Sequence, residues 1–143
     1  MFKHGSGQAA IEQACRCLSG ARHHKVLRGN FERHANEWRL PWAILPEVDY
    51  LVSSRLGADV GREFLHDLAD GAWAVEWGEA VDLVRASEIA RRYKALKLGL
   101  VDCIVMAITE RLEADAIATL DVRHFSAVAI RGEPRLLPRD LEA

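Results

Sequence analysis

The chain has 143 residues, of which 50% are hydrophobic and 28% are charged, and its formal net charge is −2. This length suits one ordinary domain, and the composition is typical of a globular chain rather than a disordered one. Proteins that bind nucleic acid through their overall charge are usually basic. Any contact with RNA must therefore use local positive patches, or metal ions held by acidic side chains.

Two features of the sequence bear on where the protein works. It has no run of 18 apolar residues that could span a membrane, and Gly-Ser-Gly-Gln at residues 5–8 takes the place of a signal peptide's apolar core. Cys15, Cys17 and Cys103 are an odd number of cysteines without the spacing of a disulfide framework. We therefore expect a reduced, cytoplasmic protein.

Hydrophobic patterning divides the chain into an atypical segment, residues 1–21, and one domain over residues 22–143. The first segment contains several glycines and serines and no pattern typical of a strand. The spacing of apolar residues and the positions of glycine and proline predict the remaining elements. In chain order these are helix 26–38, strand 40–45, helix 46–57, helix 60–71, strand 73–77, helix 79–97, helix 101–112, strand 116–120 and strand 127–130.

The apolar residues of three of these helices predict how each helix is buried. The helix over 60–71 is expected to turn Leu65 inward, and the helix over 79–97 is expected to bury Val81, Val84 and Ile89. The helix over 101–112 is apolar almost all round, which is typical of a helix packed inside a protein. Strands alternate with helices, so we expect an α/β fold with a mainly parallel sheet covered by helices on both faces.

Three acidic residues fall where such a sheet binds ligands, beyond the carboxyl ends of its strands. Glu47 follows the strand predicted to end at Leu45, Asp121 follows Leu120, and Asp102 opens the buried helix. Carboxylates about 5 Å apart repel by roughly 3 kcal/mol per pair at an effective dielectric constant near 20, so a cluster of them needs a cation. Oxygen ligands suit Mg²⁺ or Mn²⁺, and a metal-bound water can attack a phosphodiester.

The same three acids have a purely structural interpretation. An acid in the first turn of a helix is stabilised by the helix dipole by about 0.3–1 kcal/mol, which by itself explains Glu47 and Asp102. Asp121 fits the start of a turn. Each acid taken singly favours this interpretation, and only their occurrence together at one rim favours a metal site.

Three motifs in this order resemble the PIN-domain ribonucleases, in particular the VapC toxins. The segment Leu45–Leu51 resembles the motif that carries the second acid of that family, and Leu98–Cys103 resembles the motif with the third. Thr119–Phe125 resembles the Thr-x-Asp segment with the fourth acid, and Gly71-Ala72-Trp73 followed by a long helix and Gly99 also fits. The resemblance extends from about Arg22 to Pro138.

This resemblance implies a three-layer α/β/α fold and an endoribonuclease that depends on Mg²⁺ or Mn²⁺. It implies Glu47, Asp102 and Asp121 as metal ligands and catalytic residues, with Thr119 hydrogen-bonded within the site. It also implies an RNA substrate, a VapB-type antitoxin and a homodimer, with no membrane partner.

The sequence departs from the family at its beginning. Members of the family start with a strand that ends in the first acidic ligand, whereas the only acid before Glu32 here is Glu12, in a helix-like context. Our hypothesis is that residues 1–21 come from a shifted reading frame or replace a lost segment. Loss of one of four ligands would weaken metal binding and lower nuclease activity.

Other constellations have weaker claims to a function. Cys15 and Cys17 with His23 and His24 lack the spacing of known zinc sites. The basic run Arg91–Lys97 fits either a solvated helix face or a contact with RNA phosphates. Beside the acids, His124 fits packing or a phosphate contact better than general-base catalysis, since a metal ion already supplies hydroxide.

Three functions remain open from the sequence alone. The first is an active metal-dependent ribonuclease toxin, and the second is an inactive PIN-fold remnant that binds an antitoxin or another partner. The third is an unrelated α/β binding protein whose acids only cap helices. Metal binding separates the first from the third, and RNA cleavage separates the first from the second.

Overall fold

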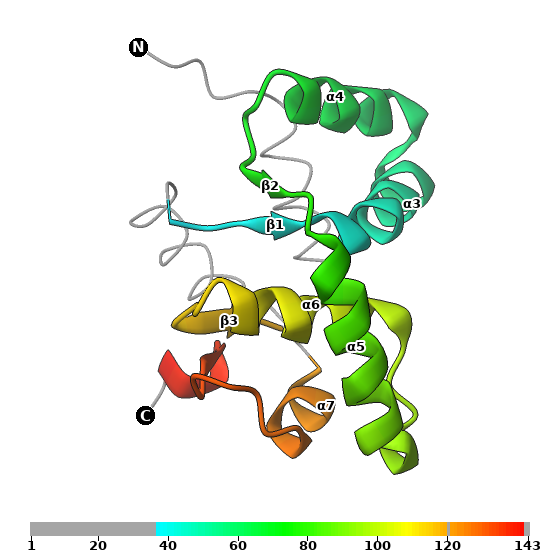
Figure 1. Cartoon of the computed structure of the whole chain (residues 1–143). Coiled ribbons are helices and arrows are strands. Elements are labelled where there is room, and N and C mark those ends of the chain that lie inside the picture. The colour runs from blue at the N-terminus through cyan, green and yellow to red at the C-terminus, as the bar shows by residue number, and fades with distance from the viewer. Residues whose placement is uncertain (1–36, 120, 142–143) are drawn as a thin grey trace. The chain divides into compact units, whose positions relative to one another are not determined.

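The computed structural model describes residues 37–119 and 121–141 (Figure 1), and the chain divides into two compact units, Met1–Glu76 and Trp77–Ala143. The predictions for segment 1–21, and for the helix over 26–38 as far as residue 36, lie outside the described residues. Within the described residues, no helix combines the length and hydropathy that crossing a membrane requires.

The described elements alternate between short strands and helices. In the first unit they are β1 (Leu40–Pro41), the 3₁₀ turn η1 (Trp42–Ile44), α3 (Leu45–Leu56), α4 (Ala58–Ala69) and β2 (Val75–Glu76). In the second unit they are α5 (Ala80–Arg92), η2 (Lys94–Leu96), α6 (Leu100–Arg111), β3 (Ala116–Ala118), α7 (Val122–Ala127), β4 (Arg135–Leu137) and η3 (Arg139–Leu141).

The predicted strand over 40–45 is correct only for its first two residues. β1 pairs in parallel with β2, with Leu40 opposite Val75, and the chain then turns through η1 into α3. Pro46 lies in the first turn of α3, where its fixed φ suits a helix and its missing N–H costs no hydrogen bond. Helix formation therefore reaches back into a run of residues that hydrophobicity alone predicted as extended.

Helices α3 and α4 form a hairpin around one apolar cluster. Val52 and Phe64 are fully buried at its centre, and the apolar residues packed against them are Leu45, Val48, Leu56, Val60 and Leu68. A Cβ atom at Gly61 would overlap Ser53 Oγ, so a larger residue there would force the Ser53 side chain to move. Leu65, predicted to face inward, is instead 65% exposed.

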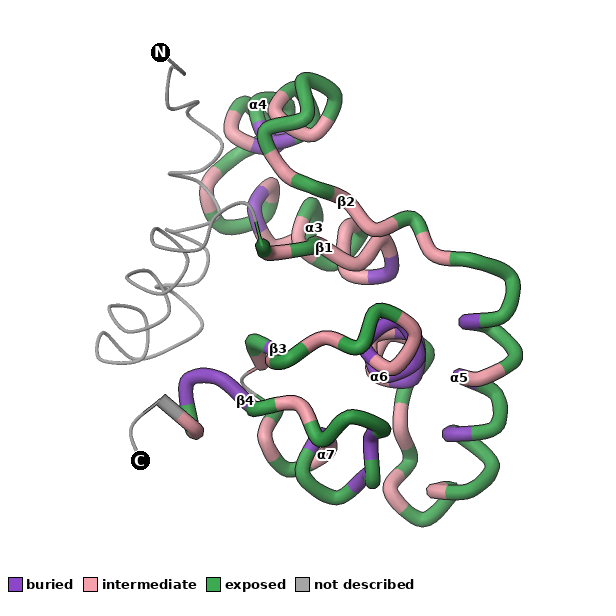
Figure 2. The backbone as a smooth tube through the Cα atoms, turned by 60° about the vertical axis from the view of Figure 1, so that its left-hand side comes forward, coloured by how far each residue is buried: buried purple, intermediate pink, exposed green. Residues whose placement is uncertain are grey.

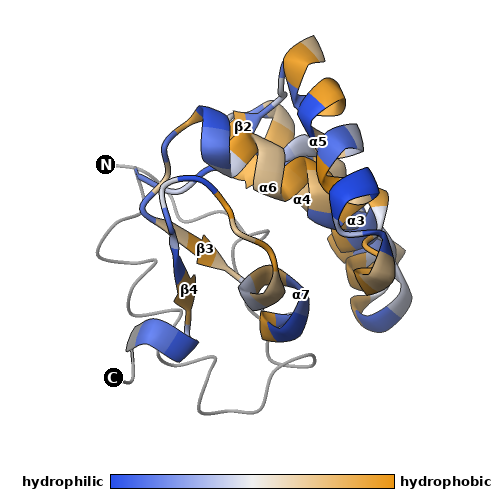
Figure 3. Ribbon diagram, turned by 60° about the horizontal axis from the view of Figure 1, so that its bottom comes forward, coloured by the Kyte–Doolittle hydropathy of each residue, from blue (hydrophilic) through white to orange (hydrophobic). Residues whose placement is uncertain are grey.

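Helices α5 and α6 pack side by side in the second unit (Figure 2). As predicted, α6 is buried over most of its length, while α5 is amphipathic, with hydrophilic and hydrophobic residues alternating along it (Figure 3). The predicted burial on α5 is right for Ile89 and wrong for Val81 and Val84, which are exposed; the other buried positions are Asp82 and Ala86.

An ion pair explains why an aspartate occupies the buried face of α5. Asp82 Oδ1 accepts a hydrogen bond from Arg111 Nε of α6 at 2.9 Å, and Asp82 Oδ2 accepts one from the backbone N–H of Glu79 at 2.8 Å. A buried carboxylate with both oxygens hydrogen-bonded can be accommodated without a large desolvation penalty. Hydrophobicity alone could not predict this face, since it gives no weight to a partner 29 residues away.

A second ion pair joins the two helices. Arg85 Nε and Nη2 donate to the two carboxylate oxygens of Glu110 at 2.7 and 3.1 Å, and the Glu110 side chain is only 4% exposed. Burial alone would raise the pKa of Glu110, but hydrogen bonds from Arg85 and from the backbone N–H of Arg131 outweigh it and lower that pKa. The bidentate geometry fixes how α5 lies along α6.

The C-terminal strands differ from the sequence prediction. Residues 127–130 do not form a strand: Ala127 ends helix α7, which was not predicted, and Val128 and Ile130 are buried in irregular structure. The strand that pairs in parallel with β3 is β4, with Ile117 opposite Leu136. Asp140 Oδ2 accepts the N–H of Leu136 at 2.6 Å. A side chain thus satisfies a backbone donor of this short strand.

The fold class is mixed α/β, with parallel strand pairs and five α-helices among the described residues. The strands form two pairs, β1 with β2 and β3 with β4, in separate units. The parallel pairing agrees with the sequence prediction.

We predict that the Arg85→Met substitution lowers the free energy of unfolding by about 2–3 kcal/mol at neutral pH, because it leaves a buried carboxylate without its main partner. The pKa of Glu110 is lowered in the folded state, so the stability that this pair contributes is present above the unfolded pKa and is lost as the pH falls through the folded value. The difference between the variant and the wild type should therefore shrink in acid. Urea denaturation at neutral and acidic pH measures it.

The matched control is Arg91→Met, on the same helix, where the arginine is exposed. We expect a change within about 0.5 kcal/mol for this control. Equal losses of stability in both variants would show that the ion pair with Glu110 contributes nothing to the packing of α5 on α6.

Candidate functional site

Asp102 lies in the first turn of α6. Gly99 is the N-cap of this helix, and the side chains that follow Asp102 in α6, from Cys103 to Thr109, are mostly buried. The apolar helix is thereby fixed in the core of its unit, and its N-terminal end presents the carboxylate of Asp102, whose side chain is 26% exposed. The helix dipole stabilises a negative charge at this position.

Asp121 is the N-cap of α7. Its Oδ1 accepts a hydrogen bond from the backbone N–H of His124 at 3.1 Å, the usual capping interaction three residues into a helix. The Oγ1 atom of Thr119 in turn accepts the backbone N–H of Asp121 at 3.1 Å. Thr119 thus holds the turn that orients Asp121, which agrees with a hydrogen-bonding rather than a ligating position for this threonine.

His124 brings the two acids together. Its Nδ1 lies 2.9 Å from Asp121 Oδ2 and 3.4 Å from Asp102 Oδ2, so one ring nitrogen faces both carboxylates. The His124 side chain is 19% exposed, and its Nδ1 is buried without a hydrogen bond of good geometry to any described residue. The sequence favours packing or a phosphate contact for His124 over general-base catalysis. The place of this histidine between the two acids was missed because helix α7, which turns its ring toward Asp121, was not predicted.

Two carboxylates this close favour the presence of a positive charge between them. At about 5 Å and an effective dielectric constant near 20, their repulsion is roughly 3 kcal/mol. Either a protonated imidazole of His124 or a divalent cation could neutralise it. The oxygen donors on the two aspartates fit a hard cation such as Mg²⁺ or Mn²⁺.

The Cys103 thiol beside this site is not a source of charge. Burial raises its pKa, and the negative charge of Asp102 adds to this effect, so the thiol stays neutral.

Glu47 belongs to the other unit. It lies exposed in the first turn of α3, two residues into the helix rather than beyond the end of a strand as predicted. Its approach to Asp102 and Asp121 stays a prediction. Within the described ranges 37–119 and 121–141, no group of three or more histidine, cysteine or acidic side chains has the arrangement of a metal site.

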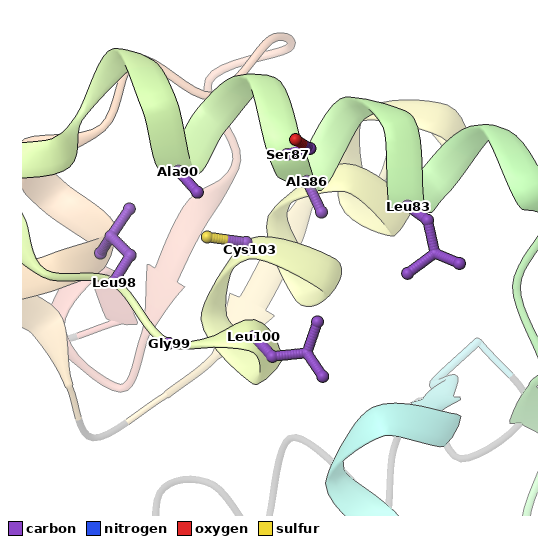
Figure 4. Close-up of a pocket in the computed structure, with 8 residues that line it drawn as sticks. All are labelled: Leu83, Ala86, Ser87, Ala90, Leu98, Gly99, Leu100 and Cys103. Carbon is purple, nitrogen blue, oxygen red and sulfur yellow. The ribbon is translucent and has the colours of Figure 1, made fainter.

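An apolar hollow of about 280 Å³ lies between α5 and α6, and Figure 4 shows the side chains around it. Apart from Ser87 and Cys103, its lining carries no polar side chain; the lining residues are Leu83, Ala86, Ser87, Ala90, Leu98, Gly99, Leu100 and Cys103. It therefore offers no carboxylate ligand for a metal ion, in contrast to the site formed by Asp102, Asp121 and His124.

Comparison with known proteins identifies the family. The family model of the PIN domain matches residues 15–131. Ribonuclease VapC26 of Mycobacterium tuberculosis (strain ATCC 25618 / H37Rv) is 35% identical over 85 residues, which is 59% of this chain and 63% of that protein. The chain thus spans less than two thirds of the length of this relative. With more than half of its residues matched by the family model, the chain belongs to the PIN domain family and is related to the VapC ribonucleases.

Proposed function

We propose that this chain is an endoribonuclease that depends on Mg²⁺ or Mn²⁺ and is the toxin of a type II toxin–antitoxin system. The observation that carries the proposal is the pair of carboxylates from Asp102 and Asp121, both facing His124 Nδ1 within 3.4 Å, in a chain of the PIN domain family. Clustered carboxylates are costly unless they hold a cation. The name of the relative, a ribonuclease, supports RNA as the substrate.

In this proposal Glu47, Asp102 and Asp121 hold the metal ion, and Thr119 keeps Asp121 in position through its hydrogen bond to the backbone. When bound, the metal ion would supply a hydroxide at neutral pH and stabilise charge on the phosphate oxygens. Asp121 combines its role with capping α7, because only its Oδ1 is used by the cap while its Oδ2 faces His124 Nδ1. The same geometry is why the capping interpretation and the ligand interpretation of Asp121 are compatible.

The proposal extends to fold, partners and location. It includes a three-layer α/β/α arrangement over residues 22–143, a VapB-type antitoxin, a homodimer and a cytoplasmic setting, which the resemblance to VapC toxins supports. The hypothesis that residues 1–21 come from a shifted reading frame is tested by translating the coding DNA in the other two frames. Without the family's first acid, we expect the nuclease to be weak.

A second candidate function is a partner-binding module without catalysis. It is favoured by Val81 and Val84, which are three residues apart near the start of α5 and are 55% and 62% exposed, and by Trp77, which precedes that helix by three residues and is 72% exposed. Apolar side chains grouped on a surface in this way are typical of protein interfaces. RNA cleavage separates the two functions, because a binding module would keep its partner and cleave nothing.

We predict slow cleavage of RNA that requires Mg²⁺ or Mn²⁺ and is abolished by EDTA. Asp102→Asn and Asp121→Asn should each lower the rate at least about 100-fold, since removal of a charged ligand weakens transition-state stabilisation by a few kcal/mol. A metal-titrated cleavage assay on labelled RNA measures these rates. Asp115→Asn, which removes an exposed aspartate of the same unit, is the matched control and should leave the rate unchanged. Cleavage that survives in Asp102→Asn would contradict the proposal.

We also predict that Mg²⁺ raises the melting temperature of the wild type but not that of Asp102→Asn. Ligand binding to the folded state adds about 2.7 kcal/mol at a concentration 100 times the dissociation constant. In EDTA, Asp102→Asn should be at least as stable as the wild type because the repulsion from Asp121 is removed. Thermal denaturation with and without Mg²⁺ checks both points. A rise of the same size in both proteins would mean that the metal ion binds elsewhere.

A further inference from the structure

A basic segment, defined as residues 91–97, stands out in a chain whose net charge is −2. It contains four cationic residues and no acidic one; the four are Arg91, Arg92, Lys94 and Lys97. All four are exposed. The segment therefore presents a local positive charge that the overall composition conceals.

The cations of this segment differ from the arginines that hold the second unit together. Arg85 and Arg111 form ion pairs with carboxylates of the packed helices. None of the four cations in the basic segment forms an ion pair with a carboxylate of the described residues, and only Arg92 has a contact of another kind, over the ring of Tyr93 at 5.7 Å. These charges therefore contribute little to the fold and are available to an anion.

The chain connects the basic segment directly to Asp102, which together with Asp121 is called the acid pair. Lys97 ends η2 in a left-handed conformation (φ 54°), and Gly99 two residues later is the N-cap of α6. Asp102 lies in the first turn of that helix. Two steps of about 3.8 Å lead from Lys97 to Gly99, and residues three apart in a helix, such as Gly99 and Asp102, lie about 5–6 Å apart. The Cα atoms of Lys97 and Asp102 are therefore at most about 13 Å apart.

A hydrogen bond joins Tyr93 of the basic segment to the chain that follows α7. The hydroxyl oxygen of Tyr93 accepts the backbone N–H of Ala129 at 3.1 Å, just after α7 ends. Figures 1 and 2 show the end of α5 beside α7 in both views. The basic segment is thus fixed at Tyr93 to the chain just after the C-terminal end of α7, while Lys97 lies two residues before the N-cap of α6.

We propose that the basic segment binds the phosphate backbone of a single-stranded RNA substrate on the α5 side of the acid pair. This inference rests on the proposed function, since it extends the path of a strand whose phosphate is at Asp102 and Asp121. Lysine and arginine neutralise phosphates without reading the sequence, and such contacts position the strand. An RNA is favoured over an acidic protein because the proposed site for a metal ion and a phosphate, at Asp102 and Asp121, includes a residue only five positions after Lys97.

Binding of a short, labelled, single-stranded RNA, measured by fluorescence anisotropy in EDTA over a range of salt concentrations, tests this proposal. EDTA prevents cleavage, so binding is measured whether or not the chain is a nuclease. For Lys94→Gln/Lys97→Gln we expect the slope of log Kd against log salt to fall by about 1.4, at about 0.7 for each lost phosphate contact. Kd itself should rise roughly tenfold at low salt.

Two matched variants complete the experiment. Arg55→Gln/Arg135→Gln removes the same charge from exposed positions outside the segment and should keep the wild-type slope. Lys94→Arg/Lys97→Arg keeps the charge and should restore both the slope and Kd. Circular dichroism on each variant reports whether the helices are retained.

The proposal is overturned if the wild type binds no RNA. It is also overturned if Lys94→Gln/Lys97→Gln and Arg55→Gln/Arg135→Gln lower the slope of log Kd against log salt by the same amount. Tighter binding of a polyglutamate peptide than of RNA, with the same dependence on Lys94 and Lys97, would overturn it in favour of an acidic protein partner. A wild type that binds RNA through this segment but cleaves none in Mn²⁺ would refute the nuclease while leaving the surface in place. If the wild type cleaves RNA but Lys94→Gln/Lys97→Gln keeps the wild-type slope of log Kd against log salt, the RNA-binding role of the basic segment is refuted and the nuclease is not.

Discussion

The packing of α5 against α6 is the interaction on which the rest of the second unit depends. Helix α6 is so apolar that it is stable only when covered, and α5 covers it with Ala86 and Ile89. Two ion pairs, from Arg111 to Asp82 and from Arg85 to Glu110, then fix how the helices lie on each other. Since Asp102 is in the first turn of α6, its position is set by this packing and not by a flexible loop.

The acids at these helix ends carry out two tasks at once. A carboxylate near a helix N-terminus stabilises the fold through the helix dipole, and Asp121 adds a capping hydrogen bond to His124. The same placement brings it near Asp102, and their mutual repulsion is offset only by a positive charge. Helix capping alone does not explain why the free oxygens of both acids face one buried nitrogen.

How much the sequence could predict depends on whether the determining forces are local. The helix predicted over 79–97 is shorter in the structure, where α5 ends at Arg92 and η2 follows. Helix bounds at Gly57 and Gly71 and the start of α6 at Gly99 followed from residues close in the chain, and so did the burial of α6. The buried face of α5 did not, because Asp82 is kept inside by Arg111 far along the chain. Likewise β4 pairs with β3 although Arg135–Leu137 has no strand pattern, while the more apolar segment 127–130 forms no strand and buries only Val128 and Ile130.

The candidate site shows the same division between local and distant effects. Asp102 and Asp121 could be singled out because each follows an element boundary that is visible in the sequence. His124 could not be placed between them without knowing that α7 forms, since a helix is needed to turn its ring toward the Asp121 side chain. The charge balance of the unit follows from this arrangement. The arginines that pair with buried acids stabilise the core, whereas the cations of the basic segment form no ion pair with a carboxylate of residues 37–119 or 121–141. A protein that is acidic overall can therefore still present a positive surface where an RNA strand would pass.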